Sequence, residues 1–504
     1  MLIVKVDVAN LEYDIHSLVK AFYPEETVKV LTPDKENAEG GLIDCILNAQ
    51  PTTFYISLLS NPPQIVYSDE ENGLTHCYTA TAPYDFKVSG GLLQKGDKNK
   101  FKQFLYLSLC DIHQKSLPWG NLTGIRPTKI AMTMIEDGKD DTQIADFMKQ
   151  NHFVSDEKIK LATEIAHREH DLLNKLHVEQ GYSLYIGIPF CPTRCLYCSF
   201  TSNPICAFEK EVDTYIDCLE KEMVYVSEAF SDRILDSVYV GGGTPTTLSA
   251  EQLDRLLSLL EKYFDLSHIL EFTVEAGRAD SITKEKLQVL HDHKVGRISV
   301  NPQTMKEETL KIIGRQHTVS QVKDAFRLAK EIGFDNINMD MILGLPGEDE
   351  VDVAETICQI RELDPDSLTV HSLAIKRASK LKQWVEENGI DCLNNTDDMM
   401  KVAAKGAADM GMDPYYLYRQ KNMSGNFENV GYAKPGKYGI YNILIMEEVQ
   451  TIVALGAGSI TKRVFSDGRI ERCDNVKDVK LYIEKIDEMI ERKRKLFADK
   501  QILW

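Results

Sequence analysis

The stretch that decides the fold is IGIPFCPTRCLYCSF, residues 186–200, in which Cys191, Cys195 and Cys198 form a Cys-x3-Cys-x2-Cys pattern. The apolar segment SLYIGIP, which leads into it, has the length and composition of a buried β-strand. The three thiols have three competing explanations: they pack as small apolar side chains, pair as disulfides, or gather around a metal. The rest of the chain has to decide among these.

Beyond residue 181 the sequence alternates between strand-like and helix-like segments. The candidate strands are SLYIGIP, SVYVGG, EFTVEA, GRISVN, NINMDMI and SLTVHSL, and the helical stretches between them include residues 208–229, 250–263, 319–332 and 350–363. This alternation is typical of an α/β protein, and six units predict a parallel sheet closed or nearly closed into a barrel. Functional residues of such barrels follow the carboxyl ends of the strands, where the three cysteines lie.

Two further regions flank the predicted barrel. The N-terminal part mixes strand-like runs (LIVKVDV, GLIDCILN, TFYISLL) with a helix near residues 14–22, and helical periodicity dominates residues 140–177. We therefore expect three regions: an N-terminal α+β domain with a helical connector (1–178), the barrel (179–375) and a mixed C-terminal extension (376–504).

Composition excludes several classes of function. A net charge of −19 disfavours nucleic-acid binding, which requires clustered Lys and Arg. No apolar run reaches the roughly 18 residues that span a bilayer. The segment MLIVKVDVANLEYD fits an edge strand better than a signal peptide. We therefore expect a cytoplasmic protein without a membrane span.

The chain has 11 cysteines, an odd number, which disfavours a disulfide framework. A structural zinc site takes four protein ligands. A [4Fe–4S] cluster can take three thiolates and leave one iron open, so the pattern favours a cluster held by Cys191, Cys195 and Cys198. Zinc and simple packing remain alternatives, and Cys206 lies close enough in sequence to be a further candidate.

Two other features of the predicted barrel are candidates for ligand binding: a glycine-rich turn after one strand and two acids within strands. The glycine-rich turn in VYVGGGTPTTL, residues 238–248, allows a ligand or another backbone segment to come close. Glu275 and Asp340 stand in apolar strands, where an unpaired charge is costly, so each needs a partner. That partner is either a ligand or one of the nearby arginines, Arg278, Arg297 and Arg315.

The cysteine pattern and its surroundings resemble the radical S-adenosylmethionine (SAM) superfamily. The segments YIGIPFCPTRCLYC, GGGTPT, TVEAGR, RISVNPQTM, IGRQHT and NINMDMILGLPGE occur in order over residues 185–348 and resemble the oxygen-independent coproporphyrinogen III oxidase family. LPWGNLTGIRPTKI and YYLYRQKNMSGN are similar to a long variant of that family. The resemblance implies a partial (β/α)6 radical SAM barrel, a [4Fe–4S] cluster, and SAM as the source of a 5′-deoxyadenosyl radical.

The resemblance also implies which residues contact SAM. Carried over position by position, the family's contacts fall on Tyr185, Tyr197, Gly243, Thr244, Glu275, Gln303, Arg315, Asp340, Ala374 and Ile460. The position of the oxidases' fourth cysteine is Phe200, an absence shared with the family's heme-chaperone branch. That branch shows a His-Asn-x-x-Tyr-Trp element where this chain has ENVGYA, with Glu428 and Ala433 replacing His and Trp.

The activity implied by the resemblance is oxidative decarboxylation of coproporphyrinogen III to protoporphyrinogen IX, with a reduced flavodoxin- or ferredoxin-type electron donor. The alternatives are a heme- or porphyrin-binding carrier and a radical SAM enzyme that acts on heme. A porphyrinogen carries carboxylates, for which Arg126, Lys129, Arg419 and Lys421 are candidate partners; each could equally be a surface charge. We also expect the N-terminal region and a loop at 415–432 to shield the barrel mouth.

Overall fold

The computed structural model describes residues 1–24, 26–34, 52–69, 74–81, 84–376, 379–389, 393–420 and 427–498. The chain divides into two compact units, Met1–Glu164 and Ile165–Trp504. The division falls inside helix α6, Asp156–Leu173, rather than at residue 178. The reason is that Leu172 and Leu173 already pack into hydrophobic clusters of the second unit.

The first unit is built on a five-stranded sheet with the order β2-β1-β3-β4-β5. The strands are β1 Leu2–Val6, β2 Val28–Leu31, β3 Thr52–Ser57, β4 Gln64–Asp69 and β5 Leu74–Thr79. β1 runs parallel to both of its neighbours, whereas β3, β4 and β5 pair antiparallel. The predicted strand GLIDCILN lies outside the described residues.

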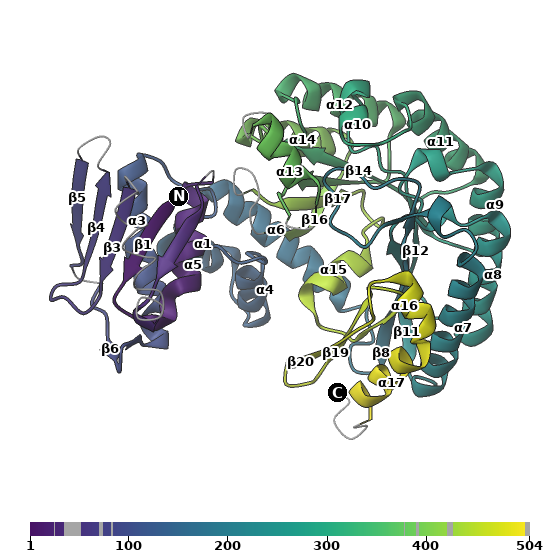
Figure 1. Ribbon diagram of the computed structural model, residues 1–504, viewed down its shortest axis with the longest axis horizontal. Helices are drawn as coiled ribbons and strands as arrows, with labels where there is room; N and C mark the ends of the chain where they lie inside the picture. Colours follow the sequence, from purple (N-terminus) through teal and green to yellow (C-terminus); the bar gives the residue numbers. More distant parts are fainter. Residues whose placement is uncertain are drawn as a thin grey trace. The chain divides into compact units, whose positions relative to one another are not determined.

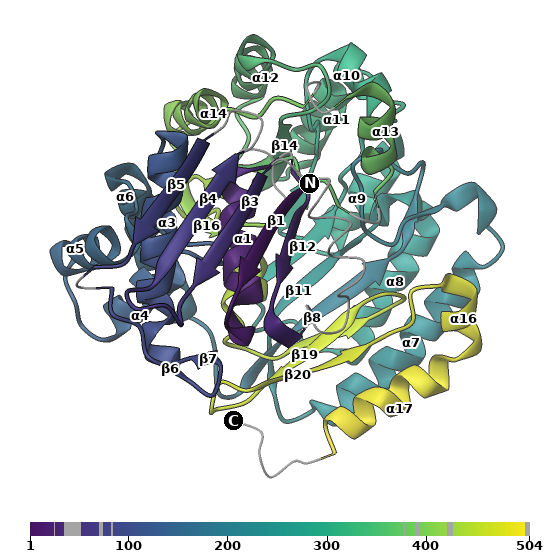
Figure 2. The same cartoon turned by 60° about the vertical axis from the view of Figure 1, so that its left-hand side comes forward.

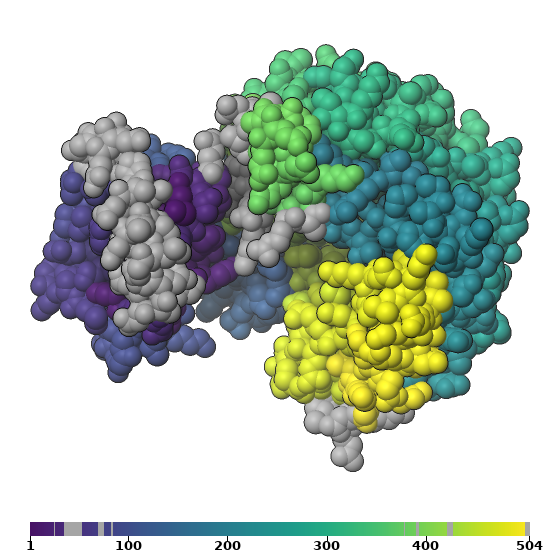
Figure 3. Space-filling model, in the orientation of Figure 1, coloured from purple at the N-terminus to yellow at the C-terminus, as the bar shows by residue number. Residues whose placement is uncertain are grey.

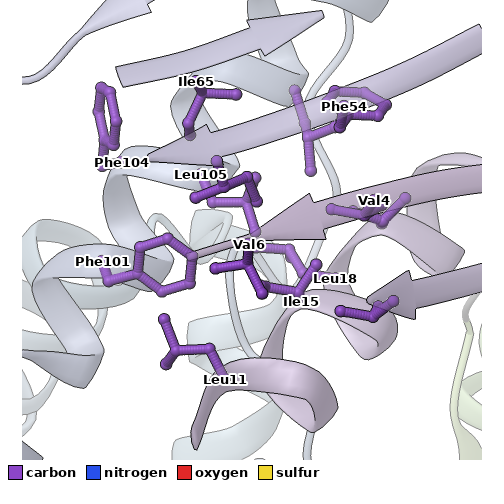
Figure 4. Packing of buried hydrophobic residues seen from close by; sticks show 14 of the residues in the cluster. Val4, Val6, Leu11, Ile15, Leu18, Phe54, Ile65, Phe101, Phe104 and Leu105 are labelled. Carbon is purple, nitrogen blue, oxygen red and sulfur yellow. The ribbon is translucent and has the colours of Figure 1, made fainter. Parts of the chain in front are cut away.

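Helices α1, Glu12–Phe22, and α3, Lys98–His113, supply the other half of this core. Alternate strand residues such as Val4 and Val6 share one buried cluster with helix residues such as Leu18 and Phe101 (Figure 4). The remaining elements of this unit are η1 Ala9–Leu11, β6 Val88–Ser89, β7 Leu92–Leu93, η2 Lys95–Asp97, α4 Lys129–Glu136 and α5 Asp141–His152.

The second unit confirms the predicted alternation of strands and helices. Its six parallel strands are β8 Gly181–Ile188, β11 Ile234–Gly242, β12 Glu271–Glu275, β13 Arg297–Ser299, β14 Ile337–Leu343 and β15 Ser367–Ser372. They lie side by side in this order. Nearly every residue of β14 is buried, as expected for a parallel strand covered on both faces.

Helices line the outer side of these strands (Figure 1). They are α7 Val212–Ala229, α8 Ala250–Tyr263, α9 Lys284–Asp292, α10 Glu307–Ile312, α11 Val319–Ile332 and α12 Glu350–Leu363. Ser249, Thr318 and Asp349 begin α8, α11 and α12 with capping boxes, in which each side chain accepts a backbone N–H of the first turn. These caps fix where each helix leaves its loop, and the loops carry the candidate site.

The C-terminal region continues the barrel sheet at both edges and is part of the same unit. β16 Asp413–Tyr418 and β17 Asn429–Ala433 extend the sheet antiparallel beyond β15. β18 Ile452–Leu455 pairs parallel with β8, and β19 Ile460–Val464 and β20 Ile470–Asp474 follow it (Figure 2). In the segment 415–432, which we expected to be a loop, residues 415–418 and 429–432 therefore belong to two strands, and residues 421–426 lie outside the described part of the chain. Pairing with the core sheet satisfies the backbone groups that a loop would leave to water.

Among the described residues of this region, five helices complete the fold. They are α13 Leu381–Asn388, α14 Asp397–Asp409, α15 Ile440–Glu447, α16 Val479–Glu484 and α17 Ile486–Leu496. The space-filling view shows the C-terminal residues in yellow against the teal helices of the barrel (Figure 3). Among the described residues, no helix combines the length and the apolar character that crossing a membrane requires.

A buried ion pair joins α17 to α7. Lys493 Nζ lies 2.6 Å from Glu222 Oε1, and both side chains are fully buried. Glu222 also accepts hydrogen bonds from Asn475 (3.0 Å), Tyr482 (2.5 Å) and the backbone N–H of Gly456 (2.8 Å). These contacts fix the turn after β18 against α7.

Candidate functional site

Three free cysteines occupy the loop that follows β8. Cys191 ends the short strand β9, Phe190–Cys191; Cys191 and Cys195 are buried, and Cys198 is half-buried. Among the described residues, no group of three Cys, His, Asp or Glu side chains could hold a single metal ion. A [4Fe–4S] cluster does not require such convergence, because each thiolate binds a different iron atom. The arrangement of the three cysteines is therefore compatible with a cluster.

The surroundings of the sulfur atoms fit thiolates bound to a metal. Burial raises the pKa of the Cys191 thiol to about 11, so a thiolate there needs a nearby positive charge, which iron would supply. Thr244 Oγ1 donates to Cys191 Sγ at 3.5 Å, and Arg278 Nη1 donates to Cys195 Sγ at 3.8 Å. Donors aimed at sulfur suit a thiolate better than a neutral thiol.

The glycine-rich turn lies directly against this loop. The backbone N–H groups of Gly243 and Thr244 donate to Ile188 O and Phe190 O, both at 2.7 Å. A Cβ at Gly243 would stand 2.4 Å from Phe190 O, and Gly242 has a φ of 108°. Gly243 is therefore required because the cysteine loop comes so close. From the sequence alone, this packing role could not be distinguished from a role in ligand binding.

Glu275 ends β12 and Asp340 lies within β14. Glu275 accepts a hydrogen bond of 2.5 Å from Tyr239, and Asp340 accepts one of 2.7 Å from Asn338 Nδ2. Burial raises the pKa of the Glu275 carboxyl to about 7, against the opposing effect of the Tyr239 hydroxyl. Burial also acts to raise the pKa of Asp340, but His371, 3.8 Å away, contributes to holding it below its usual value.

The arginine alternative for these two acids does not hold among the described residues. Arg278 pairs with Asp280, Arg297 donates to Asn336 and to a backbone carbonyl, and Arg315 donates to Asn301 O at 2.6 Å. No described Lys or Arg forms an ion pair with Glu275 or Asp340 within 4.0 Å. Glu275, a buried carboxyl with a raised pKa and no such partner, has the character of a ligand-site residue, whereas Asp340 is held by His371.

Gln303, Arg315 and Tyr197 lie on the same side of the barrel. Gln303 has a φ of 68°, in the left-handed region that non-glycine residues rarely adopt, and its backbone bonds Asp340 O and Ile342 N, each at 2.9 Å. Such strain is often kept where a side chain must be aimed at a ligand. Arg315 Nη2 donates to the Tyr197 hydroxyl at 3.2 Å, which ties the β13–α11 region to the cysteine loop.

Tyr185 belongs to an aromatic stack. Its ring lies 6.2 Å from Tyr239 and 6.0 Å from Tyr441, while Tyr239 and Tyr441 stack at 4.3 Å. Tyr239 carries the hydroxyl that donates to Glu275, so this stack holds the donor of that hydrogen bond in place. Its members come from β8, β11 and α15, which are far apart in sequence, and only Tyr185 was singled out from the sequence.

The remaining sequence-derived candidates fall into different surroundings. Ala374 is buried just beyond β15, and Ile460, at the start of β19, is 45% exposed. Arg419 is not a surface charge: it is buried beside Glu428, and burial lowers its pKa to about 10. Arg126 and Lys129 lie in the first unit, and Lys421 lies outside the described residues.

Two functional candidates escaped the sequence analysis. His371 in β15 lies between Asp340 and the hydroxyl of Tyr418, which is 3.4 Å from its Nδ1. Arg278 was considered as a partner for Glu275 and Asp340, but it pairs with Asp280 and also contacts Cys195. The clue to His371 was a histidine within an apolar strand, three residues before Ala374. Nothing in the sequence indicated that Arg278 contacts a cysteine.

Comparison with known proteins relates the barrel and its cysteine loop to a superfamily. The radical SAM superfamily model matches residues 185–359. The oxygen-independent coproporphyrinogen-III oxidase-like protein HemZ of Bacillus subtilis (strain 168) is 41% identical over 411 residues, which cover 79% of this chain and 82% of HemZ. The heme chaperone HemW of Lactococcus lactis subsp. lactis (strain IL1403) is 39% identical over 285 residues, covering 56% of this chain and 70% of HemW.

A solved structure agrees on the fold. Coproporphyrinogen III oxidase (HemN) from Escherichia coli, described as a radical SAM enzyme, superposes with a TM-score of 0.50 at 22% identity. The match covers 64% of this chain and 72% of HemN.

Proposed function

This chain belongs to the radical SAM superfamily and, within it, to the oxygen-independent coproporphyrinogen III oxidase family, and on that premise we propose that it oxidatively decarboxylates coproporphyrinogen III to protoporphyrinogen IX. In this reaction two propionate side chains become vinyl groups. Each loses a hydrogen from its β-carbon, one carbon dioxide and one electron. A reduced flavodoxin- or ferredoxin-type protein is the proposed electron donor for the cluster.

We assign Cys191, Cys195 and Cys198 as the ligands of a [4Fe–4S] cluster and leave Cys206, which is exposed, outside the set. The cluster and SAM, when bound, supply the radical that removes the substrate hydrogen. The chain's own task is to hold these groups in place and exclude water. The cysteine loop is fixed for that task by contacts with the glycine-rich turn and with Arg315.

Glu275 and Asp340 are the proposed contacts to the ribose hydroxyls or the sulfonium of SAM. Both acids are held by neutral donors or by a histidine, so they keep acceptor capacity that a hydroxyl or a cation would use. A cation near Glu275 would also favour its charged form and thereby gain binding energy. Gln303, which is held by its backbone bonds to Asp340 and Ile342, is a further proposed contact to SAM.

The substrate's carboxylates require cations. Lys376, two residues beyond Ala374, has its ammonium 5.6 Å from the centre of the Phe200 ring. Burial lowers the pKa of Lys376, a cost that a substrate carboxylate would offset. We therefore assign Lys376 to a propionate. Arg419 is less suited to this role, because Glu428 already lies beside it.

The observation that carries the proposal is the joint presence, in one barrel, of three free thiols after β8 and two buried acids, Glu275 and Asp340, with no described Lys or Arg as an ion-pair partner. The test is an anaerobic assay of the reconstituted full chain with coproporphyrinogen III, SAM and a reductant. We expect 5′-deoxyadenosine and protoporphyrinogen IX to form together. Production of 5′-deoxyadenosine without any vinyl product would contradict the proposed substrate.

A second candidate is a heme carrier, favoured by the similarity to HemW and by Phe200 at the position of the oxidases' fourth cysteine. Glu428 and Ala433 weigh against it, since neither can replace the His and Trp of the chaperone element. Tight binding of hemin by the reconstituted chain, without SAM consumption in the presence of coproporphyrinogen III, would favour the carrier. SAM consumption that requires heme would favour a heme-modifying enzyme.

A further inference from the structure

Arg278 connects the loop after β12 to the cysteine loop. Its side chain is buried, with Nη1 3.8 Å from Cys195 Sγ. The same nitrogen donates to the backbone carbonyl of Thr193 at 2.9 Å and to the Thr193 hydroxyl at 2.8 Å. A full positive charge therefore lies against one cysteine of the set and against the backbone two residues before it.

Asp280 fixes the direction of this guanidinium. Its carboxylate accepts from Nε at 3.0 Å and from Nη2 at 2.6 Å, a two-bond pairing that holds the plane of the group. His317, whose side chain is fully buried, also lies near this carboxylate, with Nδ1 3.6 Å from Asp280 Oδ1. Arg278 therefore keeps one orientation, with Nη1 directed at Cys195.

The neighbouring sulfur has a different donor. Cys191 receives the neutral hydroxyl of Thr244 at 3.5 Å, whereas the donor at Cys195 is charged. Reduction adds one negative charge to an iron–sulfur cluster, and hydrogen bonds and positive charge at its sulfur ligands stabilise that added charge. The two cysteines thus differ in how strongly their surroundings favour the reduced state.

We propose that Arg278, oriented by Asp280, is a positioning residue that acts through Cys195 to raise the reduction potential of the bound cluster. Arg278 stabilises the extra negative charge of the reduced state, and Asp280 partly cancels that effect with its own charge. The cluster itself is implied by membership of the superfamily, and the proposal does not depend on which tetrapyrrole is the substrate. It therefore stands or falls separately from the proposed reaction.

The experiment is a redox titration of the reconstituted full chain without SAM, followed by the electron paramagnetic resonance signal of the reduced cluster. Arg278→Gln removes the charge, and we expect the reduced-to-oxidised ratio at a fixed potential to fall about tenfold, a shift of about 59 mV to lower potential. Asp280→Asn removes the compensating charge, so its midpoint should move in the opposite direction.

Arg297→Gln is the matched control. Arg297 is also a buried arginine, but it stands at the start of β13 and donates to Asn336 and to Lys437 O, so its midpoint should equal that of the native chain. Unchanged midpoints in both Arg278→Gln and Asp280→Asn, or shifts of the same sign, would overturn the proposal and leave Arg278 a loop contact only. If Arg278→Gln takes up no iron, Asp280→Asn decides alone: a midpoint that does not rise overturns the proposal.

Discussion

Two acidic side chains of the second unit, Glu222 and Glu275, have opposite surroundings. Glu222 is surrounded by a complete set of donors, including the ammonium of Lys493 at 2.6 Å. Glu275 has the Tyr239 hydroxyl and, among the described residues, no ion pair within 4.0 Å, and burial raises its pKa to about 7. The protein thus supplies Glu222 with a full set of hydrogen-bond donors and a cation, whereas Glu275 receives fewer donors and no cation. An acid of the first kind holds parts of the fold together, and one of the second kind is ready for a ligand.

The largest expected effect is the loss of the cluster when one of its cysteines is replaced, without a loss of folding stability. Cys195→Ala should abolish cluster assembly and SAM cleavage, because the remaining two thiolates cannot hold three irons of the cluster. Its unfolding midpoint without iron should stay close to that of the native chain. Iron content, the absorption spectrum and thermal unfolding of the apoprotein measure these outcomes.

Cys206→Ala is the control for this first prediction, because Cys206 is exposed. It should keep the cluster and its SAM cleavage. A loss of iron in Cys206→Ala as complete as in Cys195→Ala would show that the set of three ligands is wrong.

The next effect lies in the network around Glu222. Lys493→Met should lower the free energy of unfolding of the second unit by about 3–5 kcal/mol, because it leaves a buried carboxylate without its cation. SAM affinity of the folded protein should not change. Urea unfolding of the apoprotein measures the loss, and the double variant Glu222→Gln with Lys493→Met should recover part of it. Equal stability of Lys493→Met and the native chain would show that the buried Glu222 does not depend on its cation.

A smaller effect is expected for the two acids of the mouth. Glu275→Gln keeps the volume and removes the charge, so SAM affinity should fall about tenfold, or about 1.4 kcal/mol. The cluster spectrum should persist, and the free energy of unfolding at neutral pH should not decrease. Calorimetric titration with SAM measures the affinity. Unchanged affinity in both Glu275→Gln and Asp340→Asn would return these acids to a structural role.

The smallest effect concerns pH and the same carboxyl. Because the folded-state pKa of Glu275 is raised from 4.5 to about 7, its neutral form contributes stability that is fully present below about pH 4.5. That contribution is lost as the pH rises through about 7, by at most ~1.4 kcal/mol per pH unit. Glu275→Gln should therefore flatten the stability of the apoprotein across this window. Parallel curves for the variant and the native chain would mean that Glu275 does not titrate there.

The sequence predicted those parts of the molecule that depend on local pattern. The six strand–helix units appear because apolar strands and capped amphipathic helices are visible within short windows. The place of the cysteine loop followed from the rule that parallel strands present their carboxyl ends at one edge, and the two acids were singled out because a charge in an apolar strand is costly. In the structure Glu275 and Asp340 lie near enough for their charges to interact.

What the sequence could not predict depends on contacts between distant segments. Tyr441 stacks on Tyr239 only because α15 packs beside β11, and Arg419 is buried only because β16 joins the sheet. Arg278 could have paired with several acids, and its partner became evident from distances alone. The left-handed backbone of Gln303 has no sequence marker either, since glutamine is not a residue that favours it.

The parallel pairing of β8 with β18 has a consequence for how the protein is made. Residues 183–186 take residues 452–455 as a neighbouring strand, so β8 remains an edge until residues 452–455 have been synthesised. During translation the nascent barrel exposes that edge next to the unoxidised thiols of the cysteine loop, and long-range pairing of this kind is slow. An unpaired strand edge can pair with another chain, so the unfinished barrel, rather than the mature protein, is the form most exposed to aggregation.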